Sequence, residues 1–312
     1  MSDNAARRIT KPSPTPSVSI RAISQVPPMS FSLVGLLNFA SPGDRRSRRL
    51  ASGLSYGERP RQRLDVYGPR QPNGPAPVVV YIYGGAWNEG DRRDFAFVAR
   101  WLAGLGYLVV VPDYRVLPEV EYPVFLEDCA DAVRWTLQHA AGYGGDASRL
   151  ALTGHSAGAY NAVMLALEPA YGVVDAIDAV VGLSGPYNFY PFDVPISIRT
   201  FSGAADLMAT QPVNLVTSAA PPMFLASADG DTVVGPQNTV ALAHRLREHG
   251  VAVTERHFPR FTHPSTLLEL GSLLTRRSSL AGEVAEFLAH TLRLAPPDGG
   301  AMIGRRKEGA GR

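Results

Sequence analysis

The pentapeptide Gly154-His155-Ser156-Ala157-Gly158 constrains the fold of this chain more than any other segment. Residues 148–153 before it are typical of a short buried strand, and the small and apolar residues 157–167 after it are typical of a helix. A G-x-S-x-G turn between a strand and a helix is sharp and lifts the serine hydroxyl out of the sheet, and a side chain at either glycine would collide with a neighbouring element. The segment predicts a strand–turn–helix unit with Ser156 at its apex; the alternative is a glycine-rich turn with an incidental serine.

Apolar strand candidates alternate with helix candidates from residue 78 onward. Such an alternation indicates a parallel sheet covered by helices on both faces. Two more strand candidates, residues 54–56 and 63–67, flank a polar turn and predict an antiparallel hairpin at the sheet edge. The fold class is therefore α/β, with a mostly parallel central sheet. The alternating strands are expected at residues 78–83, 107–111, 148–153, 177–183, 223–226 and 251–257, and the helices at residues 93–105, 125–141, 157–167, 236–249 and 279–292.

Length and composition indicate a single large domain. The chain has 312 residues, of which 45% are hydrophobic, so it can bury a large core. Residues 1–28 are rich in Ser and Pro and are expected to be disordered, as is the tail at 295–312. The domain is expected to span residues 29–294, beginning with a short amphipathic helix at 31–39. Prolines and aromatic residues concentrate at 185–220, where we expect a small cap over the domain.

Charge and hydropathy argue against two kinds of partner. A net charge of +2 is too small to predict nucleic-acid binding, and the Arg-rich residues 44–49 are expected to form a solvated surface turn. The longest apolar stretch near the start, residues 31–40, has about ten residues, whereas a membrane span needs about twenty. A cytoplasmic location is the default expectation, because that stretch also makes a poor signal peptide. The single cysteine, Cys129, falls in a predicted helix, which favours a buried structural thiol.

A second glycine-rich segment, Tyr83-Gly84-Gly85-Ala86-Trp87, follows the strand expected at 78–83. Two adjacent glycines at the end of a buried strand let the backbone turn with its N–H groups exposed. Such donors can stabilise the negative oxygen of a tetrahedral intermediate, together with the N–H of Ala157. The alternative is a plain turn in which Trp87 is a packing residue. Because the segment precedes the serine motif in chain order, the oxyanion role is favoured.

A serine nucleophile needs a base, and the base needs an acid that orients it. In sheets of this kind both follow the serine along the chain, and catalytic groups gather at the carboxyl ends of strands. Asp229 and Asp231 follow the strand at 223–226, and either can be the acid. His263 lies in a loop from which its imidazole can reach Ser156. Three other histidines downstream of Ser156, His244, His249 and His257, fall within a predicted helix or strand.

These motifs resemble those of the α/β-hydrolase superfamily, in its carboxylesterase and hormone-sensitive-lipase-like group. The resemblance covers about residues 64–263 and is closest to bacterial esterases and arylformamidase-like proteins with an H-G-G-x-W motif. The sequence is also similar to isoprenylcysteine methylesterases. Four elements in the family's order carry the resemblance: Tyr83-Gly84-Gly85-Ala86-Trp87, Pro112-Asp113-Tyr114-Arg115, Tyr143-Gly144-Gly145-Asp146 and Gly154-His155-Ser156-Ala157-Gly158.

The resemblance implies a set of site residues by position. It makes Ser156 the nucleophile and His263 the general base. The family's spacing after the strand selects Asp231 as the acid, with Asp229 as the alternative, although the His-Gly pair of that pattern is missing here. The implied oxyanion donors are the backbone N–H groups of three residues, Gly85, Ala86 and Ala157.

One position departs from the family pattern. Tyr83 stands where the family has the histidine of its H-G-G motif, which leaves backbone donors in place but changes the support of the loop. Isoprenylcysteine methylesterase-like sequences lack this histidine too. Asp113 and Arg115 are expected to brace the loop rather than take part in the chemistry.

The resemblance implies a serine carboxylesterase that hydrolyses small to medium esters through an acyl-enzyme. An arylformamidase with the same machinery and a non-catalytic ligand-binding protein of this fold are the alternatives, and the presence of His263 argues against the second. The expected partner is a small-molecule ester, with no nucleic acid and no stable membrane insertion. No cofactor is expected, since the sequence has no metal-ligand cluster, phosphate loop or dinucleotide fingerprint. Aromatic residues of the expected cap either line an apolar acyl pocket or pack the cap on the core.

Overall fold

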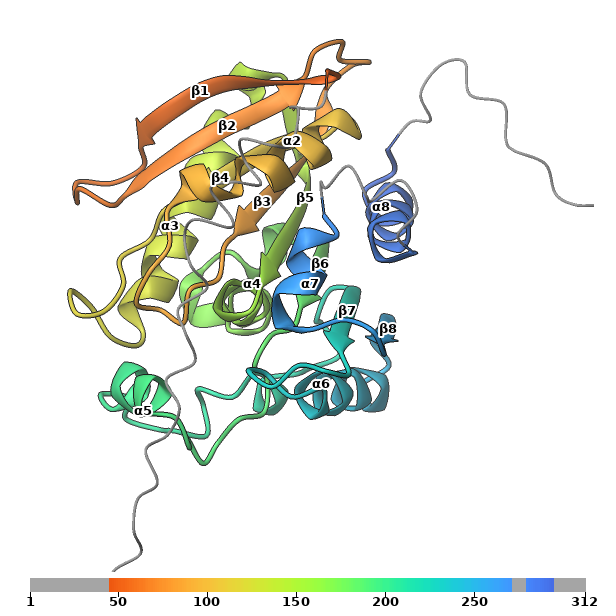
Figure 1. The fold of residues 1–312 in the computed structure, drawn as a ribbon. Coiled ribbons are helices and arrows are strands. Elements are labelled where there is room, and N and C mark those ends of the chain that lie inside the picture. The colour runs from red at the N-terminus through yellow and green to blue at the C-terminus, as the bar shows by residue number, and fades with distance from the viewer. Residues whose placement is uncertain (1–44, 271–278, 295–312) are drawn as a thin grey trace, which may run out of the picture.

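The structure is a computed structural model that describes residues 45–270 and 279–294. At its centre is an eight-stranded sheet with the order β1-β2-β4-β3-β5-β6-β7-β8 (Figure 1). β1 and β2 form an antiparallel hairpin, and β2 is antiparallel to β4. Every later pair of neighbours is parallel. The α/β class, the mostly parallel sheet and the edge hairpin expected from the sequence are confirmed.

Four of the middle strands, β3, β4, β6 and β7, are buried along their whole length, which explains their continuous apolar sequences. The edge strand β8 is more exposed and carries charged residues. The strands are β1 (Ser47–Ser55), β2 (Arg63–Pro69), β3 (Ala76–Ile82), β4 (Leu108–Pro112), β5 (Gly145–His155), β6 (Ala179–Leu183), β7 (Met223–Ala228) and β8 (Val253–Phe258).

Helices cover both faces of the sheet (Figure 1). α3 and α4 pack against each other and on the central strands. The residues just after α2 lie beside those just after α8, since a Cβ on Gly106 would lie 3.5 Å from the side chain of Leu294. The helices are α2 (Ala96–Gly104), α3 (Val124–His139), α4 (Ala157–Leu167), α5 (Pro195–Phe201), α6 (Gln237–Glu248), α7 (His263–Leu268) and α8 (Ser279–Thr291).

The parallel register brings four chain segments to one edge of the sheet. Ile82 at the end of β3 is opposite Gly154 near the end of β5, and Ala228 at the end of β7 is opposite Phe258 at the end of β8. Residues that follow these four strands therefore meet at the carboxyl edge, where ligands bind in open α/β sheets. The site predicted from the sequence lies on these segments.

The expectation for residues 44–49 is partly wrong. Residues 45 and 46 form a turn, but β1 already begins at Ser47, and Arg48 and Arg49 pair with Gly68 and Tyr67 of β2. An edge strand can carry charged side chains because one side of it faces solvent. A run of arginines therefore did not exclude a strand here.

Residues 185–220 connect β6 to β7 through α5 and the short 3₁₀ helix η5 (Pro212–Asn214). Their description as a cap stays a prediction. The segments expected at 1–28, 31–39 and 295–312 lie outside the described residues. Within residues 45–270 and 279–294, no helix is long and apolar enough to cross a bilayer.

Candidate active site

Ser156 sits at a strained turn between β5 and α4. Its backbone has φ 55° and ψ −126°, a conformation that residues other than glycine rarely adopt. A Cβ on Gly154 would lie 2.3 Å from the carbonyl oxygen of Gly158, and a Cβ on Gly158 would lie 2.0 Å from that of Ile82. Both glycines are therefore required by close packing, as the sequence predicted.

The imidazole of His263 lies between Ser156 and Asp231. Its Nδ1 is 2.8 Å from Oδ2 of Asp231, and its Nε2 is 2.9 Å from Oγ of Ser156. A carboxylate only accepts hydrogen bonds, so Nδ1 carries the proton and Nε2 accepts from the serine hydroxyl. This tautomer is the one that a base needs in order to remove the serine proton.

The geometry separates the two candidate acids. Asp231 is 6% exposed, whereas Asp229 is exposed at the end of β7. The second carboxylate oxygen of Asp231 accepts hydrogen bonds from the backbone N–H groups of Val233 and Val234 at 2.9 and 2.8 Å. Burial by itself would raise the pKa of the Asp231 carboxyl, but the hydrogen bond and charge of His263 and these backbone donors outweigh it and lower the pKa.

Residues 83–87, here called the glycine loop, lie directly against the serine turn. A Cβ on Gly84 would lie 2.7 Å from the carbonyl oxygen of His155 and 3.0 Å from Cβ of Ser156. Gly85, Ala86 and Trp87 all have positive φ, of 139°, 50° and 56°. Within the described part of the chain, the N–H groups of Gly85 and Ala86 donate no hydrogen bond, so they remain available to a ligand oxygen. Ala157, the third predicted donor, is the first residue of α4.

The first side chain of the glycine loop, Tyr83, is buried in a polar network. Its hydroxyl donates to Oδ1 of Asp113 at 2.9 Å and accepts from the guanidinium of Arg61 at 3.1 Å. Arg61 also donates to the carbonyl oxygen of Gly90 at 2.6 Å. Burial, together with the charge of Asp113, raises the pKa of Tyr83, so its phenol is a neutral donor. Asp113 thus braces the loop, as expected.

Arg115 does not contact the glycine loop through a side-chain hydrogen bond. Its guanidinium instead binds the carboxylate of Asp128 on α3, at 2.7 Å between Nη2 and Oδ1. Asp128 also accepts a hydrogen bond from Gln62 in the hairpin at 2.9 Å. Asp128 therefore ties α3 both to the segment after β4, through Arg115, and to the hairpin, through Gln62. The expectation that Arg115 braces the glycine loop is wrong.

The last side chain of the glycine loop, Trp87, is 4% exposed and lies among aromatic residues. Its indole Nε1 donates to Oδ1 of Asn161 on α4 at 3.1 Å. Its ring contacts Tyr160 and Phe201 edge to face, with centroids 5.3 and 5.1 Å apart. Of the aromatic residues expected in the cap, Phe201 is fully buried, and so is Tyr187. These two side chains pack the 185–220 segment on the core, whereas Tyr190 is 43% exposed.

Sequence reasoning missed three polar residues that hold the site together: Arg61, His155 and Asn161. Arg61 lies in the hairpin turn, 22 residues before Tyr83, and Asn161 follows Trp87 by 74 residues. His155 occupies the variable position of the serine motif, and its contact is with residue 263. The sequence offered a signal for Asn161, because an amide side chain inside the otherwise apolar helix at 157–167 needs a hydrogen-bond partner.

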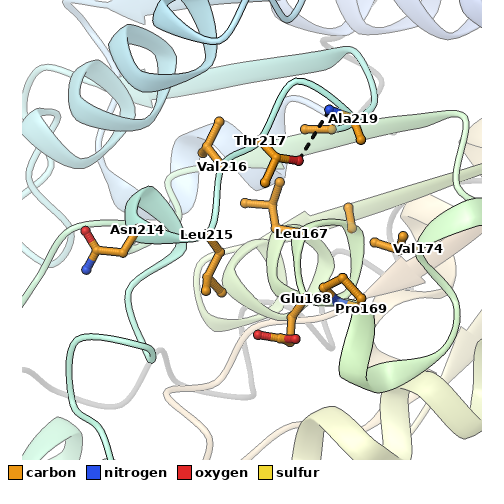
Figure 2. A pocket seen from close by; sticks show the side chains of 11 residues that line it. Leu167, Glu168, Pro169, Val174, Asn214, Leu215, Val216, Thr217 and Ala219 are labelled. Atoms are coloured by element: carbon orange, nitrogen blue, oxygen red, sulfur yellow. Dashed lines mark hydrogen bonds between the residues drawn. The ribbon is translucent and has the colours of Figure 1, made fainter.

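A separate pocket of about 320 Å³ opens at the far end of α4 (Figure 2). Leu167 lines it from the end of the helix, Glu168 and Val174 from the residues that follow, and residues 214–217 from the segment before β7. Ser156 precedes the other end of this 11-residue helix, so about 16 Å of helix separates the serine from the pocket. The pocket is therefore distinct from the Ser156 site.

Comparison with known proteins gives a family and a fold. The BD-FAE family model matches residues 64–246. The structure is similar to the solved structure of esterase B from Lactobacillus rhamnosis (HN001). The match covers 84% of this chain and 90% of that one, with a TM-score of 0.70 and 20% sequence identity. At this level of identity the likeness shows the fold, which is that of the α/β-hydrolases.

Curated relatives include two kinds of esterase. A probable isoprenylcysteine alpha-carbonyl methylesterase, ICME, of Oryza sativa subsp. japonica is 38% identical over 46% of this chain and 36% of that protein. Esterase LipC of Mycobacterium tuberculosis is 30% identical over 62% of this chain and 54% of that protein. The chain thus spans about a third to a half of the length of these relatives. Because the family model matches more than half of its residues, the chain belongs to the BD-FAE family of α/β-hydrolase-fold proteins.

Proposed function

We propose that the chain is a serine carboxylesterase that hydrolyses small to medium carboxylic esters through an acyl-enzyme. The observation that carries the proposal is the chain of two hydrogen bonds, of 2.9 and 2.8 Å, from Ser156 through His263 to Asp231. Membership of the BD-FAE family and the esterase names of its relatives support it.

In the acylation step, Nε2 of His263 takes the proton of Ser156 while Oγ bonds to the ester carbonyl carbon. The carbonyl oxygen becomes negative and accepts hydrogen bonds from the N–H groups of Gly85, Ala86 and Ala157. Asp231 stays ionised and stabilises the imidazolium that has formed. When the tetrahedral intermediate collapses, the C–O bond to the alcohol breaks, and the departing oxygen takes the proton from Nε2.

In the deacylation step, water replaces the alcohol. His263 removes a proton from the water, and the hydroxyl oxygen bonds to the acyl carbon. The second tetrahedral intermediate breaks its bond to Oγ of Ser156, which recovers the proton from Nε2. The products are a carboxylic acid and the free enzyme, and His263 has acted as base and then acid in each half of the reaction.

The test measures turnover of nitrophenyl acetate, butyrate and octanoate, with N-formylkynurenine alongside. We expect ester turnover to exceed formamide turnover, and Ser156→Ala to lower kcat by about 10⁴–10⁶-fold. A fluorophosphonate should label the unsubstituted protein, here called the parent, once, at Ser156. Ser148→Ala, at an exposed serine near the opposite end of the same strand, is the matched control and should keep parent activity. Labelling elsewhere, or an active Ser156→Ala variant, would overturn the proposal.

A further inference from the structure

His155 is a buried titratable residue that the mechanism above does not use. It is the last residue of β5, directly before Ser156, and is 2% exposed. Its Nε2 is 2.9 Å from the backbone carbonyl oxygen of His263, which can only accept, so Nε2 carries the proton. The two imidazole rings have their centroids 4.8 Å apart. Burial and the nearby His263 lower the pKa of His155 to about 3, so it is a neutral donor at physiological pH.

The same carbonyl oxygen has a second side-chain donor. The hydroxyl of Thr266 on α7 donates to the His263 oxygen at 3.0 Å. Because that hydroxyl has used its proton, it accepts one from Ser184, whose Oγ is 3.1 Å away. Ser184 follows β6 and has a strained φ of 48°. Both Thr266 and Ser184 are 1% exposed or less, so the chain Ser184–Thr266–His263 is built inside the protein.

These contacts hold the backbone of His263 from the interior of the protein. The residues between β8 and α7 include Pro259, Arg260 and Thr262, all of which are exposed. The backbone of His263 therefore enters the site from the surface, and its carbonyl oxygen accepts hydrogen bonds from two side chains inside the protein, those of His155 and Thr266. His155 is adjacent in sequence to Ser156, so its hydrogen bond links the base directly to the turn that holds the nucleophile.

We propose that His155 is a positioning residue for the reaction proposed above: its Nε2–H holds the carbonyl of His263 and thereby sets the distance between His263 and Ser156. Thr266 is the second donor to that carbonyl, with Ser184 behind it. The inference rests on the proposed function. It adds a role for His155, which occupies the variable position of the serine motif.

A matched pair of variants tests this role. Gln can place an amide N–H where Nε2 of His155 lies, whereas Met has a similar shape and no donor. We expect His155→Met to lower kcat by about 10- to 100-fold, because an error of about 1 Å in catalytic geometry can cost about 100-fold. KM should stay within about twofold of the parent, and His155→Gln should keep kcat within about threefold. Thermal melting of both variants verifies folding.

Thr266→Val and Thr266→Ser provide the same comparison at the second donor, and they keep the test decisive if His155→Met does not fold. Thr266→Val should lower kcat with little change in KM, and Thr266→Ser should restore it. Parent kcat in folded His155→Met would overturn the proposal, as would equal losses in His155→Met and His155→Gln. If the parent itself does not turn over esters, the proposed function fails instead, so the two failures are distinguishable.

Discussion

The phenol of Tyr83 and the carboxylate of Asp113 form a buried hydrogen bond of 2.9 Å beneath the glycine loop. Asp113 has further donors in Arg92, whose backbone N–H lies 2.7 Å from the same carboxylate oxygen and whose guanidinium binds the other. Arg92 also binds Asp65 of β2 at 2.7 Å. Tyr83, the one departure from the family's H-G-G motif, is therefore one member of a network that reaches from the loop to the edge hairpin.

Removal of this phenol should have a small effect on turnover. In Tyr83→Phe, Asp113 keeps its bonds from Arg92, and Arg61 keeps the carbonyl oxygens of Tyr114 and Gly90. The backbone donors of the glycine loop stay in place, whereas outright loss of one such donor costs about 10²–10³-fold. We expect kcat to fall by less than about tenfold on a short-chain ester. A folded Tyr83→Phe variant as inactive as Ser156→Ala would show that the phenol takes part in the chemistry.

Strand ends explain why Ser156, Asp231 and His263 could be predicted from the sequence. In a parallel sheet, the residues that follow consecutive strands meet at one edge, so strand positions and chain order alone bring these three together. The glycine loop was predictable for the same reason, since it follows β3. The choice of Asp231 over Asp229 came from the spacing that the family resemblance supplied, and the geometry agrees with it.

The residues that support the site were harder to predict because their partners are distant in the sequence. His155 and His263 are 108 residues apart, and Trp87 and Asn161 are 74 apart. Whether a buried polar side chain has a partner depends on tertiary packing, which local patterns do not specify. The edge strand β1 was underestimated because its exposed arginines resemble a polar turn.

The acid can be identified by one pair of substitutions. Asp231→Asn preserves the size of the side chain but removes the charge and disfavours the Nδ1–H tautomer of His263, so kcat should fall by about 10⁴-fold. Asp229→Asn, at an exposed position two residues away, is the matched control and should change kcat by less than about tenfold. The measurement is kcat on nitrophenyl butyrate, and the reverse ranking would assign the acid to Asp229.

The hydrogen bond from Trp87 to Asn161 should hold the far end of the glycine loop. In Asn161→Leu the buried indole N–H loses its acceptor, which should destabilise the fold by about 1–3 kcal/mol and lower kcat. Trp87→Phe removes the donor as well, so the double variant should lose less than the sum of the two single losses. Urea unfolding and kcat of all four proteins give the coupling. Additive losses would mean that the bond does not support the loop.

Because His155 is buried in its neutral form, the protein should be less stable at mildly acidic pH than at neutral pH. An unfolded chain binds a proton on this residue below its ordinary pKa of 6.5, whereas the folded chain does so only near pH 3. The stability is therefore complete above pH 6.5 and falls as the pH drops toward 3. Between pH 7 and 5, we expect the parent to lose about 2 kcal/mol more unfolding free energy than His155→Gln, which has no such proton to bind.

Urea unfolding of the two proteins at both pH values measures this difference, and His244→Gln, at an exposed position of α6, should behave like the parent. Identical losses in the parent and in His155→Gln would mean that His155 accepts a proton inside the fold. A protonated His155 could still donate to the His263 carbonyl, but its charge would oppose the imidazolium that forms on His263, only 4.8 Å away between ring centroids. The neutral state of His155 therefore favours both the stability of the fold and the transfer of the serine proton to His263.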